Sequence, residues 1–125
     1  MVDHWSQISP FTTSPDDVRV ADLVAEGPVR YLLVSGELDG GSWGIIGAFW
    51  LSIDGARGGF TVSPEAIWQG TEMARSYQSA LARGWTAEMI YRWWQRQIGV
   101  AGNVMVDHQH PADTLLHVYR RVGAL

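Results

Sequence analysis

The segment WGIIGAFWLSI, residues 43–53, decides the fold, because it is a long run of aliphatic and aromatic residues that favour a β-strand. In an extended chain, alternate side chains point to opposite faces. One face would carry Trp43, Ile45, Phe49 and Leu51, and the other Ile46, Ala48 and Trp50. Because both faces are apolar, we predict a central strand that is covered on both sides.

Turn signals separate this strand from two neighbouring strands. The preceding strand is predicted at Val29–Ser35, which is rich in Val, Leu and Tyr, and a turn follows at Leu38–Ser42. The glycine-rich stretch Asp54–Gly59 predicts a second turn, which leads to a short strand at Phe60–Val62. The middle of the chain therefore reads as three consecutive antiparallel strands.

Capping residues mark three helices around these strands. Ser14-Pro15 and Ser63-Pro64 each place a capping serine before a proline, which suits the first turn of a helix. These predicted helices end at Gly27-Pro28 and near Arg83, and a third, capped by Thr86, runs to about Ile98. Ala66, Gly70 and Ala74 form a row of small residues along the second predicted helix, so we expect this helix to pack closely.

The last part of the chain predicts a closing pair of strands, at Val104–Asp107 and Leu115–Val122, around a polar turn at residues 108–114. The resulting order, α-β-β-β-α-α-β-β, predicts an α+β fold with an antiparallel sheet of about five strands. We expect the helices to pack mainly on one face of that sheet. The whole chain, residues 1–125, is predicted to form a single domain, with residues 1–14 as an irregular N-terminal arm.

The composition excludes several classes of function. There is no cysteine, which excludes disulfides, thiolate catalysis and cysteine-ligated metal centres. There is no lysine, which excludes a Schiff-base lysine and the P-loop lysine, and we expect no cofactor. The net charge is −4 and the nine arginines are scattered, so we expect no nucleic-acid partner. No secretory signal or apolar run of about 20 residues is present, so we expect a cytoplasmic protein without a membrane partner.

Aromatic residues supply the first candidate site, because the chain contains seven tryptophans. Trp93 and Trp94 lie on the predicted apolar stripe of the third helix, where they either pack in the core or line a pocket. Gln97 falls within the same stripe, and its amide needs an indole, a backbone group or a ligand as partner. Tyr77 could add a further polar group. Trp68 lies opposite the predicted buried face, where it either folds onto a neighbouring loop or marks a contact surface.

Histidines supply the second candidate site. His108 and His110 are two residues apart and could share a face of a strand, and His117 could face them across the predicted hairpin. Imidazoles beside the carboxylate of Asp107 are common ligands of zinc or iron, and one imidazole could instead serve as a general acid or base. The alternative is a solvated turn, since all these residue types are compatible with turns.

Two hypotheses about function follow. The first is a non-catalytic protein-binding domain, of the immunity-protein, antitoxin or adaptor type, that uses an aromatic surface. Its partner would be another protein or a second copy, because an apolar sheet face without helices could be buried in a homodimer. The second hypothesis is a small-molecule-binding protein or small enzyme, with a tryptophan-rich pocket for an apolar or sugar-like ligand and a His/Asp cluster.

Overall fold

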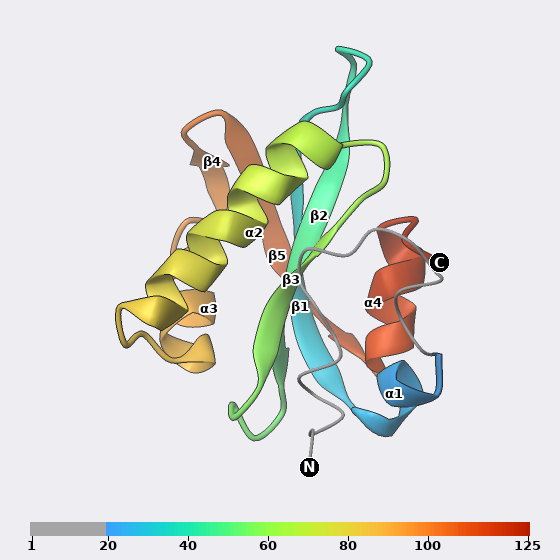
Figure 1. The fold of residues 1–125 in the computed structure, drawn as a ribbon, viewed down its shortest axis with the longest axis vertical. Coiled ribbons are helices and arrows are strands. Elements are labelled where there is room, and N and C mark those ends of the chain that lie inside the picture. The colour runs from blue at the N-terminus through green and yellow to red at the C-terminus, as the bar shows by residue number, and fades with distance from the viewer. Residues whose placement is uncertain (1–19) are drawn as a thin grey trace.

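The protein has an α+β fold in which four helices pack against a five-stranded antiparallel sheet (Figure 1). The computed structural model describes residues 20–125, so the predicted N-terminal arm and the predicted start of the first helix at Ser14 lie outside the described residues. The helices and strands are α1 Val20–Ala25, β1 Val29–Glu37, β2 Trp43–Ser52, β3 Gly58–Val62, α2 Ile67–Ala82, α3 Ala87–Gln95, β4 Gly99–Ala101, β5 Val104–Ala112 and α4 Leu115–Arg121.

The strands are ordered β3-β2-β1-β5-β4, and every pair of neighbours is antiparallel. Strand β2 is an interior strand, paired with β3 on one side and β1 on the other. Its residues from Ile46 to Ser52 are all buried. The prediction of a strand covered on both faces is therefore confirmed.

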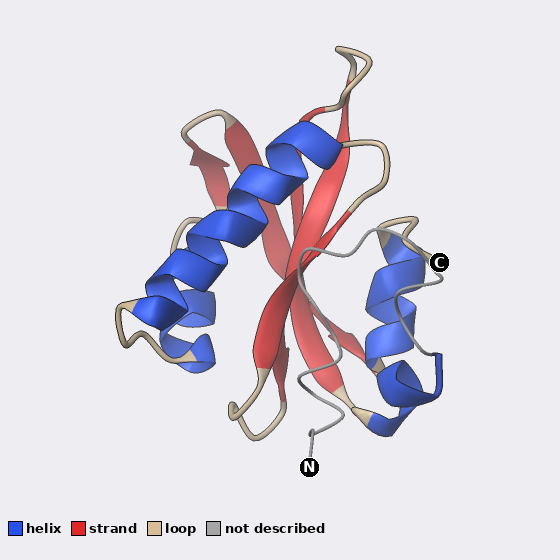
Figure 2. Cartoon of the chain, viewed as in Figure 1, coloured by secondary structure: helices blue, strands red, loops and turns tan. Residues whose placement is uncertain are grey.

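Two apolar clusters lie on opposite faces of the sheet. Helices α2 and α3 pack on one face, over residues such as Phe49 and Leu51 of β2. Helices α1 and α4 pack on the other face, over Ala48 and Trp50 of the same strand. Figure 2 shows this division, with one pair of helices on each side of the strands. The two longer helices, α2 and α3, share one face, as expected for helices packed mainly on one side, and the two short helices, α1 and α4, cover the other.

The predicted strand at Leu115–Val122 is wrong, because this segment forms helix α4. Its apolar residues follow one another at intervals of three or four, which is the spacing of one helix face. The four residues with this spacing are buried, Leu115, Val118, Tyr119 and Val122, and Leu116 is partly buried. The fifth strand is instead β4, and β5 continues through most of the expected polar turn. Because α4 covers the second sheet face, the original argument for a homodimer through that face no longer holds.

Helix α2 begins at Ile67, four residues after the predicted capping serine. The carboxylate of Asp39, in the turn between β1 and β2, accepts hydrogen bonds from the backbone N–H groups of Ile67 and Trp68, at 2.9 and 3.2 Å. A carboxylate at this position satisfies orphan donors of the first helical turn. The turn before β2 therefore holds the N-terminus of α2 in place.

Candidate functional site

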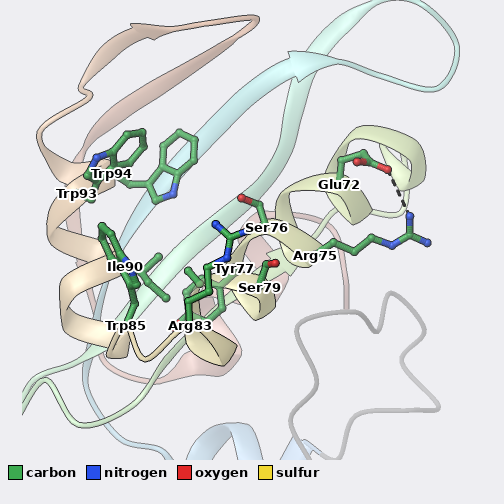
Figure 3. A pocket seen from close by; sticks show the side chains of 11 residues that line it. Glu72, Arg75, Ser76, Tyr77, Ser79, Arg83, Trp85, Ile90, Trp93 and Trp94 are labelled. Carbon is green, nitrogen blue, oxygen red and sulfur yellow. Dashed lines mark hydrogen bonds and ion pairs between the residues drawn. The ribbon is translucent and has the colours of Figure 1, made fainter.

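A cleft of about 510 Å³ lies between the C-terminal half of α2 and helix α3 (Figure 3). Its apolar wall consists of aromatic rings and one isoleucine: Tyr77, Trp85, Ile90, Trp93 and Trp94. Serine, arginine and glutamate side chains of α2 line the opposite side. Three tryptophans, Trp85 of the α2–α3 turn and Trp93 and Trp94 of α3, thus line the same cleft.

The connection between the two helices explains why the cleft forms. Gly84 ends α2 with a φ of +94°, a conformation that is readily available only to glycine. The backbone N–H of Trp85 then donates to the carbonyl of Ala80 at 3.0 Å, which places this indole between the helices. One residue later, the Thr86 hydroxyl accepts a hydrogen bond from the backbone N–H of Met89 and caps α3, as predicted.

The two adjacent tryptophans of α3 have different environments. Trp94 stacks on Phe49 of β2, with ring centroids 4.8 Å apart and an interplanar angle of 23°. Trp93 meets the edge of Trp94, with centroids 4.9 Å apart at 82°, and remains 40% exposed. Trp85 is exposed to a similar extent, at 39%. Trp94 therefore belongs to the core, while Trp93 and Trp85 present ring surface to solvent at the cleft.

The polar side of the cleft is cationic at the end of α2. Arg75 forms an exposed ion pair with Glu72, at 3.4 Å, so these two charges largely offset each other. Arg83 reaches from the end of α2 into the space between the helices (Figure 3). Within residues 20–125, Arg83 takes part in neither an ion pair nor a side-chain hydrogen bond. The cleft therefore combines exposed indole surface with one uncompensated positive charge.

Two of the predicted site residues contribute less to the cleft than expected. Tyr77 offers its ring, but its hydroxyl lies near Gly58 of β3, is buried, and has no hydrogen-bond partner among the described residues. Burial raises the pKa of this hydroxyl above its usual value. The Gln97 amide donates to the Trp93 carbonyl, at 3.4 Å, and does not line the cleft.

Trp68 lies apart from the cleft, in the first turn of α2. It is 78% exposed, so the sequence correctly placed it opposite the buried face. Of the residues that line the cleft, only Tyr77, Trp93 and Trp94 were candidates from sequence, and the two most important omissions are Trp85 and Arg83. The sequence could have indicated them by their position on either side of Gly84, because a turn between two helices brings its flanking side chains to the helix–helix junction.

The histidines do not form the predicted metal site. His110 lies 3.3 Å from the Asp107 carboxylate, and both His110 and His117 lie beside the ring of Tyr31, with centroids 5.5 and 6.1 Å from it. In the part of the chain that the structure describes, no group of three His, Asp or Glu side chains could hold a metal ion. Hydrogen bonds from the His108 backbone N–H and from His110 lower the pKa of Asp107, so this carboxylate makes local contacts within β5, where its pairing with β1 shifts register.

No family model, curated protein or solved structure matches the chain. Residues 20–125 also contain no helix long and apolar enough to cross a membrane. The function must therefore be argued from the chemistry of the cleft.

Proposed function

We propose that the protein is a non-catalytic, cytoplasmic binding domain whose α2–α3 cleft holds a segment of another polypeptide. The segment would insert an apolar, preferably aromatic, side chain next to a carboxylate. One observation carries this proposal: the exposed indoles of Trp85 and Trp93 lie beside the guanidinium of Arg83, which has no ion-pair partner among residues 20–125.

The aromatic wall explains the apolar part of the ligand. Tryptophan is enriched at the energetic centres of protein interfaces, because it buries a large area with few rotatable bonds. Trp93 is supported from behind by Trp94, which is itself stacked on Phe49. A ring that enters the cleft would thus meet a rigid surface, and little conformational entropy would be lost from the protein side.

The charge explains the acidic part of the ligand. Arginine binds carboxylates through two parallel N–H donors, a geometry that adds direction as well as attraction. Because Arg75 is already paired with Glu72, Arg83 is the cation that a bound carboxylate would meet. The serine hydroxyls of α2 that line the same side, Ser76 and Ser79, would supply further hydrogen bonds.

A small apolar or sugar-like ligand is the second candidate, and the three indoles in one cleft favour it. An enzymatic role has less support, because the Asp107–His110 pair does not line this cleft. The two candidates differ in what must accompany the ring: a peptide also offers backbone and neighbouring carboxylates to Arg83, whereas a neutral sugar does not.

An NMR titration tests the proposal. The probe is a blocked pentapeptide with one tryptophan between two pairs of glutamates, added to dilute, isotopically labelled protein. We expect the indole N–H signals of Trp85, Trp93 and Trp94 to shift, while that of Trp43 on β2 stays unchanged. Replacing the glutamates by glutamines, or Arg83 by glutamine, should weaken binding by about tenfold, which corresponds to one charge-assisted hydrogen bond.

Two outcomes would contradict the peptide-binding function. One is an absence of shifts in the cleft indoles at millimolar peptide. The other is a set of shifts that a neutral disaccharide reproduces and the peptide does not, which would favour the small-molecule function.

A further inference from the structure

Trp68 and its neighbours have the two features that we propose for a ligand of the cleft, an exposed aromatic ring and nearby carboxylates. It is the most exposed large apolar side chain among the described residues. Carboxylates flank it on the same end of α2: Glu65 three residues before, Glu72 four residues after, and Asp39, which caps the helix. The first turn of α2 thus presents an indole with carboxylates nearby, of which Glu72 is paired with Arg75 and Asp39 caps the helix.

Trp68 also lies on the same side of α2 as the residues that border the cleft. The outward stripe of the helix repeats at intervals of three or four residues: Trp68, Glu72, Arg75, Ser79 and Arg83. The acidic residue of this stripe, Glu72, lies toward its N-terminal end, Arg75 lies at the middle of the helix, and Arg83 lies at the C-terminal end. With a rise of about 1.5 Å per residue, Trp68 and Arg83 are about 22 Å apart along the helix axis.

We propose that the segment held in the cleft is the first turn of α2 from a second copy of this chain. Two α2 helices would lie antiparallel around a twofold axis near Arg75 and Ser76. This inference rests on the proposed function of the cleft, and it names the partner. An antiparallel arrangement centred there sets Trp68 beside the partner's Arg83, at the mouth of the partner's cleft, and twofold symmetry repeats the contact.

Charge complementarity at the two ends of the interface favours this arrangement, while each Arg75 near the axis is paired with Glu72 of its own chain. Each Arg83 would lie between the partner's Glu65 and the partner's Glu72, which are about one turn to either side of Trp68. A parallel pair would instead oppose like charges along the whole stripe, which is unfavourable. The two serines near the axis, Ser76 and Ser79, are small and exposed, so they permit the helices to approach each other.

The interface involves one helix face and two clefts per dimer, and it is smaller than that of an obligate dimer. We therefore expect a reversible dimer whose population depends on protein concentration and falls with added salt. This dimer uses the outer surface of α2, whereas both faces of β2 are covered within one chain.

Sedimentation velocity over a series from micromolar to millimolar protein tests the inference. The wild-type mass should rise from that of one 13.9 kDa chain toward twice that value. Trp68→Ala and Arg83→Glu should each remain monomeric across the series. The matched control is Trp43→Ala, which removes another exposed indole, on β2, and should dimerise like the wild type. Superimposable circular dichroism spectra and unfolding curves establish that the variants are folded.

A charge-swap mixture adds a test of orientation. Glu72→Arg alone should also dimerise poorly, but an equimolar mixture of Glu72→Arg and Arg83→Glu should regain association. In that pair, each substituted residue meets an opposite charge on the other chain. Failure of the mixture to associate would contradict the antiparallel register.

A wild-type chain that stays monomeric at millimolar concentration would overturn the dimer, as would loss of association in Trp43→Ala but not in Trp68→Ala. The acidic peptide separates this failure from failure of the proposed function. Peptide binding to a monomeric chain would preserve the cleft as a binding site and reject self-association. Absence of both peptide binding and dimerisation would reject both.

Discussion

Replacing Gly70 by alanine should destabilise the protein, although alanine is the better helix former. A methyl group on Gly70 would lie 2.5 Å from Val62 Cγ1 and 3.0 Å from the carbonyl oxygen of Ile46. Val62 is fully buried in β3, and the Ile46 carbonyl belongs to the backbone of β2, so neither atom moves without disturbing the core. The contact therefore costs more than a collision with a flexible surface side chain.

Two effects of opposite sign set the magnitude. Alanine in a helix interior gains about 1 kcal/mol over glycine. Inserting a methyl group into a well-packed contact typically costs about 1–3 kcal/mol, and the 2.5 Å approach at Gly70 lies at the severe end. We expect Gly70→Ala to lower the free energy of unfolding by about 1–2 kcal/mol. Gly70→Leu should lower it further, since three more heavy atoms enter the same space.

Urea unfolding followed by circular dichroism measures this change. The matched control is Ser79→Ala, an exposed position of the same helix, which should be neutral or slightly stabilising. A double-mutant cycle with Val62→Ala adds a second readout, because removal of Val62 Cγ1 should relieve part of the clash and make the two changes non-additive. A Gly70→Ala variant as stable as the wild type would mean that α2 does not pack this closely on β2 and β3.

Three further predictions concern the helix cap, the tryptophan pair and the histidine segment. Asp39→Ala should lower the free energy of unfolding by about 1 kcal/mol, because it removes the cap of α2, and thermal melts would reveal the loss. Trp94→Ala should cost about 2–3 kcal/mol, slightly less than a fully buried ring, while Trp93→Ala should cost less than about 1 kcal/mol and weaken peptide binding. Equal effects of the two tryptophan substitutions on stability would contradict this division. The pKa of Asp107 is lowered in the folded state, so its contribution to stability is present above the unfolded pKa of about 3.9 and is lost as the pH falls through the folded value. Asp107→Asn should therefore be less stable than the wild type at pH 7, and urea melts at pH 3 should show a smaller difference.

The sequence predicted the three central strands and the two longer helices because their signals are local and agree with one another. Strand β2 is apolar on both faces, and the helix that follows β3 has a regular apolar face. The segment from Leu115 to Val122 was ambiguous, since valine, leucine and tyrosine favour strands while their three- and four-residue spacing favours a helix. Packing against the second sheet face decides the outcome, and composition alone does not contain that information.

The polar segment at residues 108–112, which is part of the turn predicted at 108–114, was assigned incorrectly for a similar reason. It contains two histidines, a glutamine and a proline, none of which suits a buried strand. The segment is nevertheless extended, because it pairs with β1 on one side while β4 pairs with β5 only as far as Val106. Beyond that point it forms an edge of the sheet, where polar side chains are solvated and Pro111 need not donate a hydrogen bond.

Helix α3 shows why the candidate site could be predicted only in part. The sequence predicts one apolar stripe for this helix, formed by Met89, Ile90, Trp93, Trp94 and Ile98. Ile90 and Trp94 pack against the core, but Met89, Trp93 and Ile98 are exposed to a large extent. The helix buries Ile90, as predicted, together with Tyr91, which the stripe did not include, and the Tyr91 hydroxyl donates a hydrogen bond to Gln109 of β5 at 3.0 Å.

This orientation is possible because the apolar residues of α3 cover more than one face of the helix, so no single orientation buries all of them. Sequence periodicity measures how wide an apolar stripe is, but the tertiary contacts decide which part of it is buried. In α3, the part of the apolar stripe that stays exposed includes Trp93, at the junction with the end of α2. Helix α3 thus has more aromatic surface than its own domain buries. It lies next to Arg83, which has no partner charge among residues 20–125, and this combination is typical of a binding surface. The same excess that made the orientation of α3 ambiguous in the sequence thus forms the cleft on which the proposed function rests.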